Sequence, residues 1–418
     1  VNGEASKEEK ISEEWWKIFN DPILVSLIDR GIKSNFDLEQ AELRIKQARA
    51  SVTIARADFF PMISGSGSYR RNKSARNTSF NSIDTDSDGI VDEVPNGIIT
   101  DLYQTGLDAS WEIDIFGGNR RNTEASLADL RAVIEEHKNV LITLQGDIAT
   151  RYFTLRGLQT RLKVAKKNLE IQTQNRDITE KRYKTGFASR LDYTNAEAEV
   201  ATTSATIPTL EALVEKEIYA ISLLLGASHN SLLSKLQSEG ILPNNLPEIP
   251  VELPSEILRN RPDVKVAEAN AESATARVGV AIADMFPKFS LSGFIGVQGR
   301  HFDALGNWRN NLWNVGSSIA APIFQGGRLL ANVDVQKMLM EQSVLEYKKV
   351  VLSSLSEVEG NLLSYNNERK RWNDLARAVE MNTESLELSK KMYTEGISEF
   401  INVLNSERSL FKSEDALV

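Results

Sequence analysis

Three short motifs occur twice in this chain, in the same order and at a nearly constant offset. The matched pairs are residues 57–69 with 283–295, 115–120 with 323–328, and the Tyr-x-x-Gly motif at 183–186 with that at 393–396. The chain is therefore predicted to contain two copies of one structural unit. A unit that needs its copy usually cannot bury its apolar face alone.

The first copy, residues 37–226, is expected to contain a helix, two strands, a long helix and a return helix. Leu107, Ala109, Trp111 and Ile113 alternate with polar residues, which is typical of a strand with one wet face. The ranges predicted for this copy are strands at about 58–70 and 103–116, a long helix at 120–184 and a return helix at 189–226. Pro208 is expected to kink or split the return helix.

The second copy, residues 261–418, repeats this order. Its predicted elements are a helix, strands at about 285–299 and 312–324, a long helix at 328–394 and a return helix at 398–418. Neither long helix contains proline, and apolar residues recur at heptad spacing in both. At 1.5 Å per residue, such a helix could run about 100 Å. Residues 1–36 and 227–260, which include a proline-rich linker, lie outside the copies.

Composition and charge narrow the class of protein. The net charge of -9 argues against a nucleic-acid partner, which would require a basic face. The absence of cysteine suits an oxidising compartment without disulfides, although a cytosolic protein could also lack cysteine. The chain starts at Val1 rather than Met, which indicates a processed or trimmed form. No apolar run approaches the length of a transmembrane helix, so a membrane crossing would require strands.

The four predicted strands are each about 10 residues long, enough to cross a bilayer when tilted. Four strands cannot close a barrel, and open strand edges are not tolerated in hydrocarbon. Bacterial barrels have even strand numbers from about 8 upward, so three chains with about 12 strands would satisfy the pattern. A soluble helical protein with two β-hairpins is the alternative that the pattern alone leaves open.

Several separated motifs resemble the outer-membrane efflux channel family, the TolC-like outer-membrane factors, in its drug and metal efflux branch. They are residues 253–264 with Arg261-Pro262-Asp263, residues 283–287, Trp15-Trp16 followed by Asp21-Pro22, and Tyr393-x-x-Gly396 with residues 409–411. The match covers essentially the whole chain. The resemblance implies an α+β membrane protein, in which three chains form a β-barrel of about 12 strands in the outer membrane, four per chain. A long periplasmic α-helical barrel would continue it, with an equatorial belt that includes residues 1–36 and 227–260.

The function that the resemblance implies is the outer-membrane exit duct of a tripartite efflux pump. Such a duct passively conducts small toxic compounds or metal ions from the periplasm to the outside, and it docks to a periplasmic adaptor and an inner-membrane pump of the resistance-nodulation-division type. No nucleotide loop or catalytic triad motif is found, so no enzymatic activity is expected. The alternatives are a channel of a protein secretion system, with the same fold, and a soluble coiled-coil scaffold. Members of this branch often carry a lipidated N-terminal Cys, which this chain lacks, so lipidation stays open.

The resemblance also suggests functional residues at the ends of the long helices. Adaptor docking is expected at the two tips, at Thr185, Gly186, Phe187, Glu395, Gly396 and Ile397. Alternatively, the two glycines are only helix C-caps. The periplasmic gate is expected at Leu404 and Asn405, with Asn402 nearby and tip charge supplied by Glu399 or Asp192. A carboxylate is usual where this chain has Asn405, and acidic residues at a helix start also favour the helix dipole.

The loop between the first two strands holds an acidic motif. Asp84, Asp86, Asp88 and Asp92 follow the D-x-D-x-D-G spacing of a calcium loop, in which alternate oxygens surround a hard cation. The match is partial, because the twelfth position is Pro95 rather than Glu. A structural calcium ion is thus one hypothesis and a solvated acidic turn is the other. No other cofactor is expected.

Overall fold

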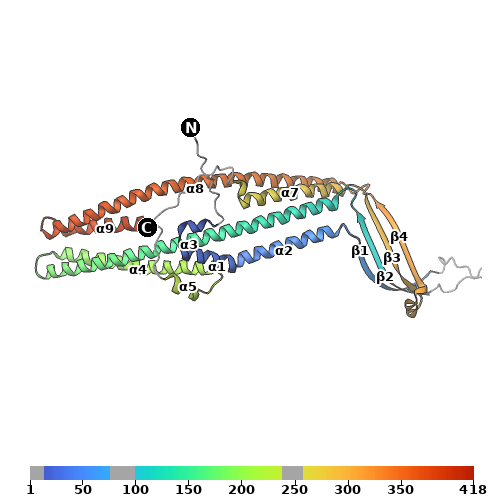
Figure 1. Ribbon diagram of the computed structural model, residues 1–418, viewed down its shortest axis with the longest axis horizontal. Helices are drawn as coiled ribbons and strands as arrows, with labels where there is room; N and C mark the ends of the chain where they lie inside the picture. Colours follow the sequence, from blue (N-terminus) through green and yellow to red (C-terminus); the bar gives the residue numbers. More distant parts are fainter. Residues whose placement is uncertain (1–13, 76–98, 238–257) are drawn as a thin grey trace, which may run out of the picture. The chain divides into compact units, whose positions relative to one another are not determined.

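The computed structural model describes residues 14–75, 99–237 and 258–418 (Figure 1). The contacts between residues divide the chain into two units. One unit, here called the helical unit, consists of residues 1–44, 134–265 and 349–418. The other, called the sheet unit, consists of residues 45–133 and 266–348.

The sheet unit contains four antiparallel strands in the order β1-β2-β3-β4. They are β1 (Met62–Lys73), β2 (Ile99–Ile113), β3 (Lys288–Gly299) and β4 (Asn311–Ala320). Each strand pairs with its neighbour along the chain, so β2 and β3, far apart in sequence, form the centre of the sheet. β1 and β4 are the two edges.

The strand register separates apolar and polar side chains onto opposite faces. Leu107 pairs with Gly65 and Ile295, and Ile295 pairs in turn with Trp313. Directly paired residues share a face of the sheet. One face therefore carries Ile63, Leu107, Ala109, Trp111, Ile113, Phe289, Leu291, Ile295, Trp313, Val315 and Ile319, and we call it the apolar face. The other carries Ser64, Ser66, Ser68, Asp108, Ser110, Glu112, Ser290, Ser292, Asn314 and Ser318, and we call it the polar face.

One aromatic ring interrupts the polar face for a structural reason. Phe294 is buried, although it shares this face with Asp108. A Cβ atom added at either Gly106 or Gly296 would lie 2.6 Å from its Cζ atom. The ring thus covers a pair of facing glycines and supplies the packing that they lack.

The limits of the first two strands differ from the predicted ones by a few residues, because β1 spans 62–73 rather than about 58–70 and β2 spans 99–113 rather than about 103–116. β1 starts at Met62 rather than 58, because α2 (Phe36–Ala57) ends in a turn in which the Phe59 and Phe60 N–H groups donate back to α2 carbonyls. β2 ends at Ile113 rather than 116, because the Asp114 carboxylate instead accepts the Arg120 N–H (3.0 Å) at the start of the next helix.

The two strands of the second predicted copy are shorter than predicted, with β3 at Lys288–Gly299 and β4 at Asn311–Ala320. β3 begins at Lys288, directly after Pro287, and β4 ends at Ala320, shortly before Pro322. Proline has no N–H to donate to a strand ladder, so both limits follow from the backbone chemistry.

The helical unit contains η1 (Trp15–Phe19), α1 (Pro22–Ser34), α4 (Arg190–Leu224), α5 (His229–Leu236) and α9 (Phe400–Leu417), together with parts of α2, α3 (Gly118–Lys184), α7 (Pro262–Ala283) and α8 (Arg328–Thr394). The limits of the two long helices, α3 and α8, and of the two return helices, α4 and α9, lie close to the predicted ones. α3 and α8 each contain 67 residues. None of the described helices carries a stretch apolar enough and long enough to span a membrane.

The core of the helical unit forms where α1 packs against α3 and α4. α1 begins at Pro22, because Asp21 accepts the N–H groups of the first turn. The second Asp21 oxygen accepts the Tyr152 hydroxyl (2.5 Å). Burial, followed by this bond to Asp21, raises the pKa of Tyr152 to about 12, so the hydroxyl keeps its proton at neutral pH. Ile28, Ile148 and neighbouring leucines complete this core.

Pro208 was predicted to kink or split the return helix, and the prediction of a split is wrong. α4 is continuous from Arg190 to Leu224 with Pro208 inside it. A proline removes one backbone hydrogen bond, but Leu210, Val214 and Ile218 beyond it are buried in the core. Burying each such side chain contributes about 1.5–3 kcal/mol, which offsets a cost of about 3 kcal/mol for the proline.

Candidate functional site

The first hairpin tip is a tight glycine turn between α3 and α4. Gly186 has φ +82, and its N–H donates to the Tyr183 carbonyl (3.0 Å). The next N–H, that of Phe187, donates to the Arg182 carbonyl (2.8 Å). These two bonds define a Schellman motif, which requires a left-handed residue that glycine adopts without a steric penalty.

The second tip, between α8 and α9, has the same geometry. Gly396 has φ +77, its N–H donates to the Tyr393 carbonyl (3.1 Å), and the Ile397 N–H donates to the Met392 carbonyl (2.9 Å). Among the described residues, no atom other than those of the glycine and its chain neighbours lies within 4 Å of a Cβ atom built on Gly186 or Gly396. Both glycines are therefore C-caps, as the alternative reading holds, and the space beside each is open.

Both tips also expose an apolar side chain directly after the glycine. Phe187 is 79% exposed and Ile397 is 67% exposed. In a Schellman motif this residue often packs back onto its own helix. The neighbouring Thr185 and Glu395 are exposed as well. All six residues predicted for docking thus lie on two glycine turns with unburied apolar side chains.

The acidic and amide residues predicted near the gate lie at the starts of α4 and α9. The Asp192 carboxylate accepts the Ser189 N–H (3.0 Å), while the Ser189 hydroxyl oxygen accepts the Asp192 N–H (3.0 Å). This reciprocal pair is a capping box that stabilises the first turn of α4. Glu399 is exposed and is the N-cap of α9 without a side-chain cap bond. The Asn402 amide donates to the Ser398 hydroxyl oxygen (2.9 Å).

The two residues predicted for the gate ring differ in their surroundings. Leu404 is only 2% exposed and packs with Ala196, Phe400 and Val403 between α4 and α9. Its side chain therefore joins the two hairpins of the chain and does not reach a surface. Asn405, the next residue, is exposed.

Hydrogen bonds and ion pairs near the tips join the two hairpins through residues that were not predicted from the sequence. The Arg408 guanidinium of α9 contacts the Glu199 carboxylate of α4, with Nε 2.7 Å from Oε2. Glu407 is buried and accepts from Asn175 of α3 (2.5 Å) and Lys390 of α8 (3.1 Å). Nothing in the sequence pattern identified its two partners, Asn175 and Lys390.

The Arg-Pro-Asp motif at the start of α7 connects that helix to α8. The Arg261 guanidinium binds the Asp263 carboxylate through two bonds of 3.0 and 2.8 Å and also contacts Glu357 (2.7 Å). Asp263 further accepts the Val264 N–H and the Ser354 hydroxyl. The Arg261 bonds are the main cause that holds the pKa of Asp263 below its usual value.

We expect Asp263→Asn to destabilise the helical unit by about 1–2 kcal/mol at neutral pH, because it removes a charged acceptor from a partly exposed bidentate pair. A lowered pKa contributes stability above the unfolded value of about 4, and this contribution is lost as the pH falls through the folded value. Denaturation of wild type and Asp263→Asn at several pH values measures the difference between their free energies of unfolding. The difference should shrink below about pH 4. A constant difference down to pH 2 would contradict the assignment.

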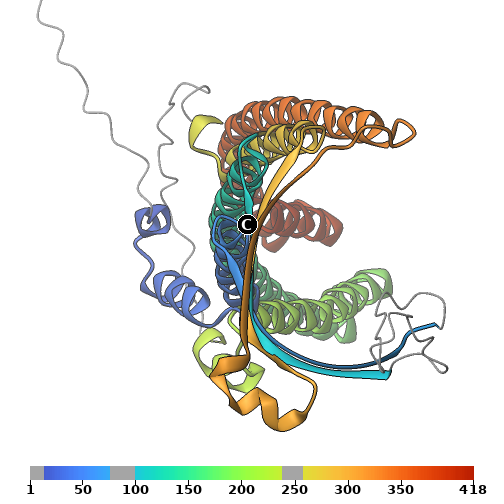
Figure 2. The same cartoon turned by 90° about the vertical axis from the view of Figure 1, so that its right-hand side faces the viewer.

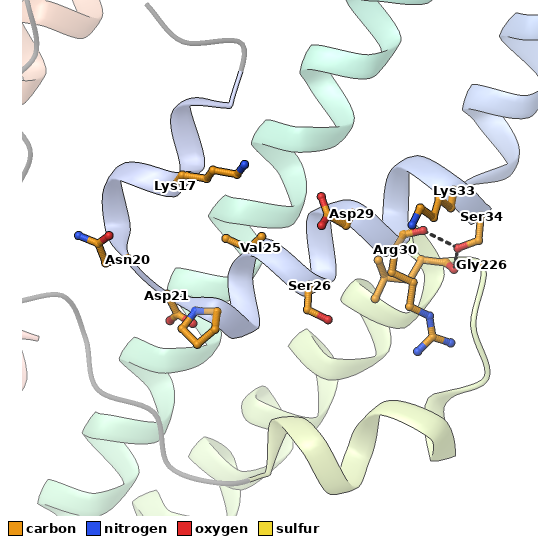
Figure 3. Close-up of a pocket in the computed structure, with 12 residues that line it drawn as sticks. Lys17, Asn20, Asp21, Val25, Ser26, Asp29, Arg30, Lys33, Ser34 and Gly226 are labelled. Carbon is orange, nitrogen blue, oxygen red and sulfur yellow. Dashed lines mark hydrogen bonds between the residues drawn. The ribbon is translucent and has the colours of Figure 1, made fainter.

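A groove of about 850 Å³ lies beside η1, α1 and the end of α4 (Figure 3). The Ser34 hydroxyl donates to the Leu225 carbonyl (2.6 Å) at one end of it. Lys17, Arg30, Lys33 and Asp29 line the groove, so both charge signs are present. Its lining therefore favours no single ligand charge.

The acidic motif at Asp84, Asp86, Asp88 and Asp92 lies outside the described residues, so a calcium site there stays a prediction from the sequence. Within residues 14–75, 99–237 and 258–418, no group of three His, Asp or Glu side chains is placed to hold a metal ion.

Comparison with known proteins gives a consistent picture. A family model described as outer membrane efflux protein matches residues 27–227 and 253–418. Nodulation protein T of Rhizobium leguminosarum bv. trifolii is 33% identical over 405 residues, which are 96% of this chain and 83% of that protein. The pyoverdine export outer membrane protein OpmQ of Pseudomonas aeruginosa is 30% identical over 405 residues, which are 97% of this chain and 83% of that protein.

The fold agrees with a solved structure of the outer-membrane channel OprN. The superposition has a TM-score of 0.90 and 32% sequence identity, and it covers 98% of this chain and 88% of that one.

Proposed function

Because this chain belongs to the outer membrane efflux protein family and is the exit duct of a tripartite efflux pump, we propose that three copies of it close into one tube. The protein resides in the bacterial outer membrane and has a periplasmic extension. The family consists of channel proteins, so the chain is not an enzyme. Its task is to give a solute a closed path, and the energy for transport comes from the pump.

The two sheet edges carry the proposal of three copies. β1 and β4 each have one side without a strand partner within the described chain. In hydrocarbon, each unpaired backbone group costs several kcal/mol, so these edges require strands from other copies. Three sheets give a closed barrel of about 12 strands, an allowed even number.

The orientation of the sheet follows from its two faces. The apolar face with Leu107 and Ile295 would contact lipid, and the polar face with Ser110 and Asp108 would line the lumen. The Ser66 hydroxyl donates to Asp108 (2.5 Å), so polar groups on this face also bind one another.

The proposal predicts that the purified protein requires detergent and has three times the mass of one chain. Light scattering with subtraction of the detergent, or native mass spectrometry, measures this mass. The reason is that a single chain cannot pair the backbone N–H and C=O groups along its two open sheet edges in lipid. A monodisperse monomer that stays in solution without detergent would contradict the proposed assembly.

Adaptor docking is proposed at the two glycine turns, with Phe187 and Ile397 as apolar anchors. The supporting observations are the open space at Gly186 and Gly396 and the exposure of both anchors. The partners would be a periplasmic adaptor and a pump of the resistance-nodulation-division type.

The gate is proposed at the start of α9, where Asn405 and Glu399 are exposed. Leu404 would act indirectly, by holding the two hairpins together. The Arg408–Glu199 pair and the buried Glu407 would then need to rearrange if the hairpins separate.

The exported solute is proposed to be a small compound or a metal ion. One relative is named for pyoverdine export and another, from Pseudomonas putida, for toluene efflux, and toluene supports this size class.

A further inference from the structure

We propose that residues 300–310, which connect β3 to β4, bind the phosphate groups of outer-leaflet glycolipid through Arg300 and Arg309. The inference rests on the proposed placement of the apolar face in lipid. Its ligand is a phosphorylated lipid headgroup at the rim of the barrel.

The segment lies at the strand ends farthest along the sheet from the helices. β3 ends at Gly299 and β4 begins at Asn311, whereas Lys288 and Ala320 at the other ends lead to α7 and α8. Figure 2 shows the short helical turns η2 (Phe302–Gly306) and η3 (Trp308–Asn310) next to these strand ends. This end of the barrel would face the outside of the cell.

Glycine allows η2 to fold back over the sheet. A Cβ atom on Gly299 would collide with the Cβ atom of Ala304. Gly299 pairs with Tyr103, on the same face as Leu107. The turn η2 therefore covers the end of the apolar face rather than the polar face.

An aromatic group extends the apolar face onto this turn. The Phe302 ring meets the Tyr103 ring edge-on (centroids 6.0 Å apart), and Tyr103 contacts Tyr69 (4.7 Å). Phe302 is nevertheless 74% exposed, and Trp308 is 65% exposed. Exposed aromatic rings at the end of a lipid-facing strand are typical of the boundary between hydrocarbon and headgroups.

Two arginines flank these aromatic residues. Arg300 and Arg309 are exposed, and neither guanidinium has a hydrogen-bond or ion-pair partner among the residues that the structure describes. The only acidic residue in 300–310 is Asp303. A guanidinium presents paired N–H donors that match phosphate oxygens.

Asparagine side chains hold the backbone between the arginines in place. Asn307 accepts the Arg309 N–H (3.0 Å), the Asn310 amide donates to the Ala304 carbonyl (2.8 Å), and the Asn311 amide donates to the Trp308 carbonyl (2.8 Å). A fixed backbone lowers the entropic cost of binding. Positive charge beside exposed aromatic rings suits a lipid phosphate better than a soluble anion, because the rings need an apolar neighbour.

The test measures lipid retention by the full-length protein, purified in detergent, using native mass spectrometry with added lipid A and with enzymatically dephosphorylated lipid A. Wild type should retain the phosphorylated lipid in preference to the other. The double variant Arg300→Gln, Arg309→Gln should retain the phosphorylated lipid about 30-fold more weakly, because it loses two positive charges that each contribute about 1 kcal/mol at an anionic surface. Lys46→Gln with Arg49→Gln on α2 removes the same charge elsewhere and should change nothing.

Replacing Phe302 and Trp308 by serine should weaken retention of both lipids alike. Equal retention of the two lipids by wild type, or unchanged retention by the double arginine variant, would overturn the proposal. So would displacement of the lipid by millimolar inorganic phosphate, which would identify a soluble anion as the ligand. The same spectra report the oligomeric state. A trimer without lipid preference refutes only this inference, whereas a monomer refutes the proposed assembly.

Discussion

Efflux should stop when tryptophan replaces both tip glycines, Gly186→Trp and Gly396→Trp, while the duct still assembles in the membrane. Each glycine has a positive φ and open space beside it. Tryptophan fills that space, where an adaptor backbone would have to approach, and it also strains the turn. The measurement is the minimal inhibitory concentration of a pump substrate in cells that depend on this duct. We expect it to fall to the level of cells without the duct.

Two control variants separate bulk from backbone strain. Gly186→Asn keeps the turn, because asparagine tolerates the left-handed conformation, and it should retain most of the efflux. Gly360→Trp places the same bulk within α8, also in open space, and should be tolerated. Full resistance in cells carrying the double tryptophan variant would show that docking does not require close approach at the tips.

Period-two alternation was sufficient to predict which residues share a face of β2. Leu107, Ala109, Trp111 and Ile113 do lie together on the apolar face, because successive strand residues point to opposite sides whatever their neighbours are. The alternation could not predict that β2 pairs with β3, since register depends on contacts between residues far apart in sequence. The role of Phe294 over Gly106 and Gly296 follows only from that pairing.

The candidate gate was harder to predict than the strands. A helix with heptad spacing offers similar apolar stripes to several neighbours, so the sequence did not indicate that Leu404 packs against α4. The sequence suggested that Asp192 supplies a charge at the hairpin tip. In the structure, its carboxylate instead forms a capping box with Ser189, three residues earlier. Glu407 acquires one partner from α3, 232 residues away, and another from α8 across the second hairpin turn. The tip glycines were predictable because a Schellman motif is local.

A second large effect is expected when arginine replaces a lipid-facing residue of β2, and its size depends on how deep that residue lies in the membrane. The alternating apolar positions of β2 include Ile113, but this residue ends the strand, whereas Leu107 pairs with Gly65 and Ile295 nearer to the middle of the sheet. Arginine on a lipid face costs about 2–4 kcal/mol at the midplane and about 0–1 kcal/mol near the interface. We therefore expect Leu107→Arg to destabilise the folded barrel by about 2–4 kcal/mol and Ile113→Arg by less than about 1 kcal/mol.

Denaturation of the protein in lipid vesicles, with tryptophan fluorescence as the signal, measures both free energies. Ser110→Arg is the matched control, because Ser110 is three positions from both residues on the same strand but on the polar face. It should cost little, since a lumen side chain remains hydrated. If Ser110→Arg is as costly as Leu107→Arg, the assignment of the two faces is wrong. If Ile113→Arg is the most costly variant, the faces are right but the membrane lies closer to the helices than the strand lengths indicate.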